Sequence, residues 1–316
     1  MTGSFPEGTP AASGGAKIAF LPGRGVLRLN GKDALALLHR LSTNALLDLP
    51  PGAVRRSCLT THKAKIVDRL VVLRRERDLL LLTGEERGDR VSAWLRKYAL
   101  RDDLGLEDLS VIWRVALLFG PAADASFTEG AGMPAPGPGE IATIPVSGEE
   151  VLAVADDPVA GMSFLLAGPE AGLAILATRL TDAGVAHSDR EEWDLARIES
   201  GVPSAGRELG EETNPLETGI EDSVSFTKGC FPGQEILARL RTYGGVTRGL
   251  SRLHLEGEGP PPPGTPVRAG GAEIGVVTSS ARRPGEGSIA ALALLKKAAA
   301  SPGTEIEAGG CRGWIA

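Results

Sequence analysis

Cysteine is scarce in this chain of 316 residues, where only Cys58, Cys230 and Cys311 occur, far apart and without a C-x-x-C pair. That spacing supports neither a disulfide scaffold nor a self-contained zinc or iron–sulfur site. The four histidines also stand at no metal-ligand spacing. The sequence therefore predicts no metal site built by this chain alone.

Long apolar runs and an excess of basic residues are absent as well. No apolar run approaches the roughly 18 residues that a membrane span needs. The formal net charge of −6 argues against an electrostatic nucleic-acid binder. No complete dinucleotide fingerprint, P-loop or Gly-x-Ser-x-Gly elbow occurs. The sequence thus predicts neither nucleic acid nor a membrane among its partners.

The composition is that of a globular protein, with 42% apolar and 23% charged residues. Residues 1–15 are rich in Gly, Pro, Ser and Thr and carry no signal pattern, which predicts a disordered leader and a cytoplasmic location. Alternating strand and helix patterns predict an α+β fold with two α/β halves, over 16–120 and 121–245. Short strand-like runs broken by Gly and Pro over 246–316 predict a small β-barrel.

Hydrophobic periodicity places several elements within these halves. It predicts helices over 33–41, 85–100 and 189–200, and a buried strand over 66–73. Ser188 begins a capping-box pattern for the helix that follows it. The stretch 120–148 is rich in Gly, Pro and Ala with little periodicity, so it predicts a loop between the halves.

The stretch around Cys230 combines several features of a reactive thiol. Lys228 precedes the cysteine by two residues, and Pro232, which suits a first helical turn, follows it by two. A helix N-terminus and a nearby ammonium both favour thiolate over thiol. The alternative is that Cys230 is a small buried hydrophobe, which is the common state of a free cysteine.

Asp68 interrupts the apolar run over 66–73. A carboxylate inside an apolar strand is costly unless it has a partner or a task. The residues alone leave two alternatives open. Either the strand twists so that Asp68 reaches solvent or a nearby arginine, or the carboxylate has a functional role.

Three other charged residues are candidates for ligand contacts. Glu199, near the end of a predicted helix, accepts paired hydrogen bonds from a ligand or pairs with an exposed arginine. Glu217 makes a second polar contact or is merely solvated. Arg239 and its neighbours Arg241 and Arg248 bind ligand carboxylates or form a solvated basic face.

Two segments carry a family resemblance. Residues 228–235, Lys-Gly-Cys-Phe-Pro-Gly-Gln-Glu, resemble the signature of the folate-binding YgfZ family, which is related to the glycine-cleavage T-protein (aminomethyltransferase). Residues 197–203, Arg-Ile-Glu-Ser-Gly-Val-Pro, resemble a segment shared across the T-protein superfamily. The resemblance implies two α/β layered halves around a central folate channel and a C-terminal barrel. It also implies tetrahydrofolate as cofactor and a role in assembling or repairing iron–sulfur clusters, with client or assembly proteins as partners.

The resemblance also implies roles for the candidate residues. Glu199 matches the glutamate that hydrogen-bonds the pterin ring, and Asp68 matches the catalytic aspartate that faces the folate nitrogens. Cys230 would be a thiol at the mouth of the channel, with Lys228 beside it. Glu217 and Arg239, the second being the last residue of the signature, are the remaining expected folate contacts.

Two departures from the T-protein pattern bear on the activity. Ala64-Lys65 stands before the strand where T-proteins tend to carry Gly-Gly, and Arg69 stands where they tend to carry a second acid. These departures favour folate binding without methylene transfer. The alternatives are a folate-dependent aminomethyltransferase or demethylase that depends on Asp68, and a scaffold without folate in which Cys230 is buried.

Overall fold

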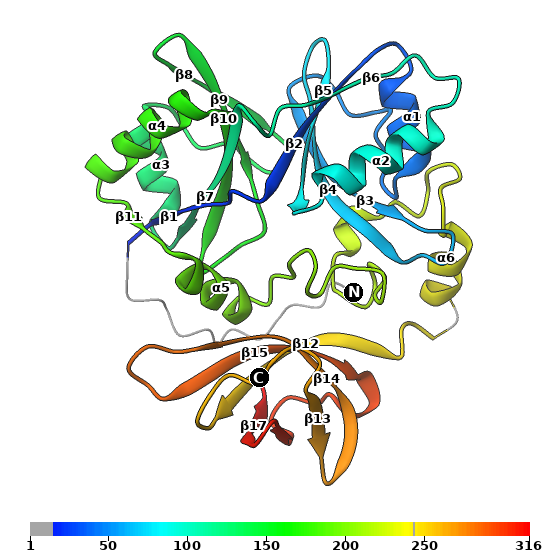
Figure 1. Cartoon of the computed structure of the whole chain (residues 1–316), viewed down its shortest axis with the longest axis vertical. Helices are drawn as coiled ribbons and strands as arrows, with labels where there is room; N and C mark the ends of the chain where they lie inside the picture. Colours follow the sequence, from blue (N-terminus) through cyan, green and yellow to red (C-terminus); the bar gives the residue numbers. More distant parts are fainter. Residues whose placement is uncertain (1–14, 243) are drawn as a thin grey trace.

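The structure is a computed structural model that describes residues 15–242 and 244–316, so the predicted leader lies outside it except for Gly15. The described chain forms two β-sheets and a closed β-barrel (Figure 1). Within these residues, no helix has the length and hydropathy needed to cross a membrane. The layered fold with a C-terminal barrel that the sequence predicts is confirmed.

The first sheet has five strands in the order β3-β4-β5-β2-β6, and each neighbouring pair is antiparallel. The strands are β2 (Arg24–Asn30), β3 (Ala53–Thr60), β4 (Ile66–Arg74), β5 (Leu79–Glu85) and β6 (Gly105–Asp108). Helices α1 (Ala34–Leu41) and α2 (Gly88–Tyr98) cover one face. Periodicity in the sequence predicts both helices. The structure agrees, because Leu37 and Leu38 of α1 and Val91 and Leu95 of α2 are buried against the strands.

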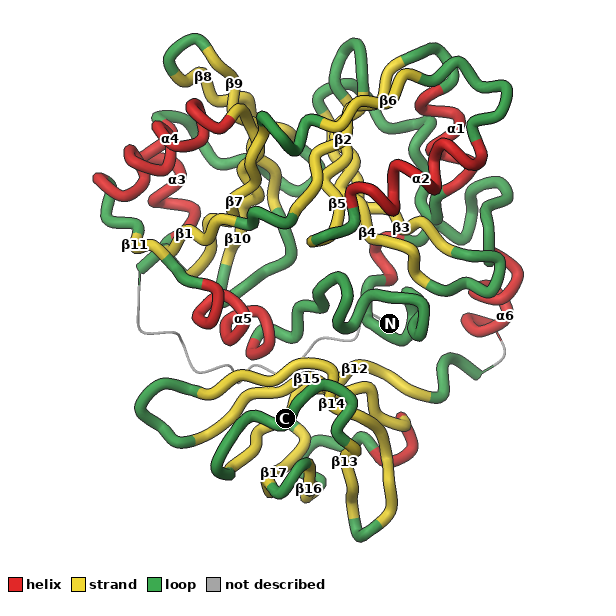
Figure 2. The backbone as a smooth tube through the Cα atoms, in the orientation of Figure 1, coloured by secondary structure: helices red, strands yellow, loops and turns green. Residues whose placement is uncertain are grey.

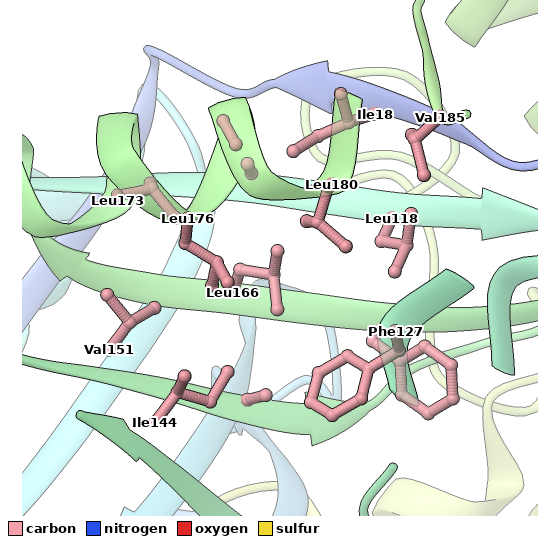
Figure 3. Close-up of a cluster of buried hydrophobic side chains, with 14 of the residues drawn as sticks. Ile18, Leu118, Phe127, Ile144, Val151, Leu166, Leu173, Leu176, Leu180 and Val185 are labelled. Atoms are coloured by element: carbon pink, nitrogen blue, oxygen red, sulfur yellow. The ribbon is translucent and has the colours of Figure 1, made fainter. Parts of the chain in front are cut away.

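The second sheet has six strands in the order β11-β1-β7-β10-β9-β8. The strands are β1 (Lys17–Phe20), β7 (Trp113–Gly120), β8 (Ile141–Val146), β9 (Glu149–Ala155), β10 (Met162–Pro169) and β11 (Ala186–His187). Helices α3 (Ala123–Ala131) and α4 (Glu170–Asp182) cover its outer face. Figure 3 shows Leu176 and Leu180 of α4 above Leu166 of β10, with Phe127 of α3 beside them.

The expectation of a loop over 120–148 is wrong, because this stretch forms α3 and β8. Helix α3 lies close against α4 through small residues. A Cβ added to Gly130 would come within 2.7 Å of the Leu180 side chain. Close helix packing therefore uses glycine and alanine here, and these residues carry little of the apolar periodicity that signals a helix.

The two sheets face each other across a shared core, with the helices on the outside (Figure 2). Val71 and Leu73 of β4 and Leu117 and Phe119 of β7 belong to this one buried cluster. Strands β1 and β7 both come from the range 16–120, yet they pair in the second sheet. The sheets therefore do not follow the order of the chain.

The C-terminal strands close into a barrel in the order β12-β15-β14-β13-β16-β17. They are β12 (Arg248–Glu256), β13 (Pro266–Ala269), β14 (Ala272–Arg282), β15 (Ser288–Lys296), β16 (Glu305–Ala308) and β17 (Cys311–Ile315). Helix α5 (Arg190–Glu199) lies on the barrel, where Ile198 packs against Ala290 and Leu292. Asp189 caps α5 one residue later than the sequence pattern places the cap, because its carboxylate accepts the Glu192 N–H at 2.8 Å.

A long connection from α5 to helix α6 (Gln234–Thr242) runs along the first sheet. The Ile66 N–H donates to the Thr213 carbonyl at 3.1 Å, and the Ser225 N–H donates to the Thr43 carbonyl at 3.0 Å. The segment that carries the cysteine signature is thereby held on the first sheet, although it follows the second sheet in the chain.

Candidate functional site

A cavity lies between the two sheets and α5, with an empty volume of about 730 Å³ that includes its open mouth. The space inside it that water-sized molecules can occupy is about 80 Å³, which is smaller than the roughly 300–1,000 Å³ of pockets that hold drug-sized ligands. Its lining comes from β2, β3, β4, β5 and β7, from the segments that follow β1 and β9, from α5 and from the connection after α5, chiefly residues 202–205. Segments far apart in the chain therefore meet around one hollow.

Asp68 of β4 lies in the wall of this cavity and is only 2% exposed. Its Oδ2 accepts the Gly84 N–H at 2.8 Å. Its Oδ1 is buried and has no hydrogen-bond partner among the described residues. Burial raises the pKa of this carboxylate to about 6, although the Gly84 N–H and the positive charges of Arg24 and Arg87 act in the opposite direction.

Gly84 at the end of β5 sets the position of this carboxylate. A Cβ added to Gly84 would lie 2.5 Å from Asp68 Oδ1 and 2.5 Å from the Cβ of Ala205. Neither neighbour can be that close to a real Cβ, so only glycine lets the chain pass here. The glycine thus brings its own N–H to one carboxylate oxygen and leaves the space beside the other open.

Charged residues form a second part of the wall. The Arg56 guanidinium donates to Asp156 at 2.6 Å, and Arg69 forms ion pairs with Asp157 and, at 2.9 Å, with Asp222. Burial alone would raise the pKa of Asp157, but Arg69 and Arg56 outweigh it and lower that pKa below its usual value. These acids are satisfied, which distinguishes them from Asp68.

The remaining wall is more apolar. Leu21 and Leu117 line it together with Trp193 of α5, whose ring meets Phe119 edge to face at 5.8 Å between centroids. Aromatic and aliphatic walls with a few convergent polar groups are typical of sites for flat organic ligands. Arg197 lies one helical turn after Trp193 and lines the same cavity.

Cys230 lies elsewhere, in the segment 227–233, which we call the Cys230 loop. Its thiol is exposed, whereas Phe231 beside it is buried. The Lys228 ammonium donates to three backbone carbonyls at the end of α1, those of His39, Ser42 at 2.6 Å and Asn44 at 3.1 Å. Burial lowers the pKa of Lys228 to about 8. The alternative that Cys230 is a buried hydrophobe is therefore wrong.

The remaining predicted contacts are spread over the molecule. Glu199 accepts from Arg283 Nε of the barrel at 2.6 Å. Glu217 accepts from Arg248 Nε at 2.6 Å and from its own turn, through the Asn214 N–H at 3.0 Å. Arg239 is exposed on α6. Of the sequence-predicted residues, only Asp68 belongs to the cavity lining as the structure describes it.

Helix geometry explains the position of Glu199. Successive residues of a helix turn by about 100°, so Glu199 lies roughly 200° around α5 from Arg197. Arg197 lines the cavity and also donates to Ser279 of the barrel, whereas Glu199 lies outside the cavity lining and pairs with Arg283 of the barrel. Sequence reasoning missed three residues of the cavity lining, Arg56, Asp156 and Asp157. For the two aspartates, the available signal was a pair of adjacent acids directly after a strand.

Comparison with known proteins identifies the family. The GCVT N-terminal domain matches residues 24–228, and the glycine cleavage T-protein C-terminal barrel domain matches residues 232–313. The chain belongs to the glycine cleavage T-protein family. Both matches describe the T-protein family as a whole, so membership of its YgfZ branch stays a prediction.

Individual relatives agree with this assignment. An aminomethyltransferase of Moorella thermoacetica is 32% identical over 90% of this chain and 79% of its own length. A putative chloroplastic transferase of Arabidopsis thaliana is 26% identical over 96% of this chain and 70% of its own. The crystal structure of aminomethyltransferase T from Bartonella henselae has a TM-score of 0.80 and 22% identity, over 96% of this chain and 85% of that one. This likeness confirms the T-protein fold.

Proposed function

We propose that this protein binds tetrahydrofolate in the cavity beside Asp68 and transfers a one-carbon unit to it, as an aminomethyltransferase-like enzyme. The observation that carries the proposal is the buried Oδ1 of Asp68, which has no partner among the described residues and belongs to a residue that lines the cavity between the two sheets. The similarity to aminomethyltransferases of the T-protein family supports the reaction class.

The cavity residues suit a pterin. A reduced pterin presents ring N–H groups, and a carboxylate oxygen without a donor accepts such a group. The rings of the ligand would lie against the apolar wall of Leu117 and Trp193. Tetrahydrofolate supplies the amine nitrogens that take up the one-carbon unit. The chain itself supplies the buried carboxylate and its orientation.

Asp68 has the properties of a proton-transfer group. Because burial raises its pKa to about 6, the carboxylate is mostly ionised at pH 7 yet accepts a proton readily. The Gly84 N–H fixes Oδ2, so the exchangeable proton belongs at Oδ1. Asp68 thus accepts a proton from a ligand nitrogen and returns it from the same atom.

Calorimetry with tetrahydrofolate tests the proposal. We expect the unaltered protein to bind and Asp68→Asn to bind at least tenfold more weakly, which corresponds to about 1.4 kcal/mol. An assay of methylene transfer from an aminomethyl donor should fall about 100-fold or more in the same variant. Equal binding by both proteins would contradict the role of Asp68, and no binding by either would contradict the folate site.

The predicted pterin contact of Glu199 is tested in the same titration. If Glu199 exchanges Arg283 for the ligand, Glu199→Ala should weaken tetrahydrofolate binding more than tenfold. If it keeps its ion pair with the barrel, the affinity should not change. Arg239→Ala and Glu217→Ala extend the comparison to the two other predicted contacts, which lie outside the cavity lining.

A second candidate function is assistance to iron–sulfur cluster assembly or repair in client enzymes. The observation that favours it is the exposed thiol of Cys230 on a loop held by Lys228 and by the buried Phe231. Such a thiol is accessible to a partner protein. We expect Cys230→Ser to restore less iron–sulfur enzyme activity than the unaltered protein in cells that lack the native one. Full restoration would rule this function out.

A further inference from the structure

A β-bulge in the barrel directs one side chain out of the barrel toward α5. The pairing of β14 with β15 shifts between Val277 and Ser279, so that one extra residue is accommodated opposite Leu292. Bulges of this kind re-aim side chains and occur often beside active sites. Ser279 is 1% exposed, and its hydroxyl leaves the barrel to meet the loop that follows α5.

The partners of Ser279 form a closed polar network. Its hydroxyl donates to Glu208 Oε1 at 2.6 Å and accepts from Arg197 Nη2 at 2.9 Å. Glu208 is fully buried, and its Oε2 accepts the Ser204 N–H at 2.9 Å and Arg197 Nη1 at 3.3 Å. Every oxygen of this carboxylate thus has a donor, as a buried charge requires.

The network ends at the cavity wall. Residues 202–205 line the cavity, and Ala205 packs against Gly84 on the side next to Asp68. Ser204 lies within this segment, and its N–H donates to Glu208 Oε2. The Ser279 hydroxyl of the barrel is therefore linked through the Glu208 carboxylate to the 202–205 wall, which lies beside Asp68.

We propose that Ser279 is a positioning residue through which the barrel sets the 202–205 wall of the cavity for ligand binding. This inference rests on the proposed tetrahydrofolate site and extends it to a residue outside the cavity. Without the hydroxyl, Glu208 Oε1 loses its donor and the carboxylate turns toward Arg197. The backbone at Ser204 then loses its fixed acceptor.

The first test compares Ser279→Ala with Thr278→Ala. Thr278 lies in the same bulge, but its hydroxyl donates within the barrel, to the Leu292 carbonyl at 3.1 Å. We expect Ser279→Ala to weaken tetrahydrofolate binding about three- to tenfold, the typical net effect of one hydrogen bond. Thr278→Ala should bind as the unaltered protein does. An equal loss in both variants, or no loss in Ser279→Ala, would overturn the inference.

Hydrogen exchange supplies a readout that needs no ligand. We expect the Ser204 amide and its neighbours over 202–205 to exchange faster in Ser279→Ala than in Thr278→Ala. If the unaltered protein does not bind tetrahydrofolate, the proposed function fails, and this exchange comparison alone decides the inference. Faster exchange in Ser279→Ala supports the positioning role, and equal exchange in the two variants overturns it.

A double-mutant cycle with Glu208→Gln tests the route. If Ser279 acts through Glu208, the two substitutions should be non-additive in tetrahydrofolate affinity. The pair Thr278→Ala and Glu208→Gln should be additive. Additive effects of Ser279→Ala and Glu208→Gln would show that Ser279 acts by another path and would overturn the inference.

Discussion

The cavity and the Cys230 loop place their reactive groups in opposite environments, one buried and the other exposed. In the cavity, the carboxylate of Asp68 is buried with one oxygen unpartnered among the described residues, an arrangement that costs folding free energy. In the Cys230 loop, the thiol is exposed and the stabilising contacts belong to its neighbours Lys228 and Phe231. Burying Asp68 lowers the stability of the fold, whereas exposing the Cys230 thiol does not. The cavity therefore carries the stronger structural evidence of a functional site.

The largest expected effect is that of filling the space beside Asp68. Gly84→Ala brings a Cβ within 2.5 Å of both Asp68 Oδ1 and Ala205. We expect a loss of about 3 kcal/mol in the free energy of unfolding, as for an overpacked core, and no measurable tetrahydrofolate binding. Denaturant unfolding and calorimetry measure the two effects. Gly229→Ala, in the Cys230 loop, is the control, because nothing lies within 4 Å of its added Cβ.

Asp68→Asn should have the opposite sign. It removes a buried charge while the side-chain oxygen still accepts the Gly84 N–H, so we expect about 2 kcal/mol of added stability at pH 7. Because the folded-state pKa is raised, the unfolded chain releases its proton first as the pH rises. The unaltered protein therefore loses stability from about pH 4 to about pH 6, whereas the variant does not. Parallel stability profiles for the two proteins over this range would contradict the buried charge.

Lys228→Met tests how the Cys230 loop is held. The substitution leaves the carbonyls of His39, Ser42 and Asn44 without the ammonium, and we expect a loss of about 1 kcal/mol in the free energy of unfolding. Burial lowers the pKa of Lys228 to about 8, so above this pH the folded chain releases the proton before the unfolded chain does, and we expect the stability of the unaltered protein relative to Lys228→Met to increase as the pH rises through about 8. Unfolding at pH 7 and pH 9 measures both points. An effect that is equal at the two pH values would show that charge is not involved.

The smallest effect should come from Cys230→Ser. The thiol is exposed, so the substitution should change the free energy of unfolding by less than about 0.5 kcal/mol. Thermal unfolding measures this change, and thiol labelling of the unaltered protein should give one rapidly reacting cysteine, since Cys58 and Cys311 are buried. A large loss of stability in Cys230→Ser would remove the contrast between the two regions.

The sequence predicts the elements better than it predicts their meeting points. Asp68 could be found because an acid in an apolar strand is locally anomalous. The pairing of Arg56 and Arg69 with Asp156 and Asp157 could not, because it joins two sheets across a distance that local patterns do not encode. The direction of Glu199 was hidden for a related reason, since a motif gives spacing along a helix but not which neighbour covers each face.

The pairing of β1 has a consequence for how the protein is made. The first described strand pairs with β7 and with β11, where Lys17 lies opposite Ala186. During synthesis this strand cannot be paired on both edges until nearly two hundred residues have left the ribosome. Contacts so distant in sequence slow folding and leave a strand edge open in the meantime. The cavity between the sheets is therefore a late product of folding, and a nascent chain interrupted before β11 would lack it.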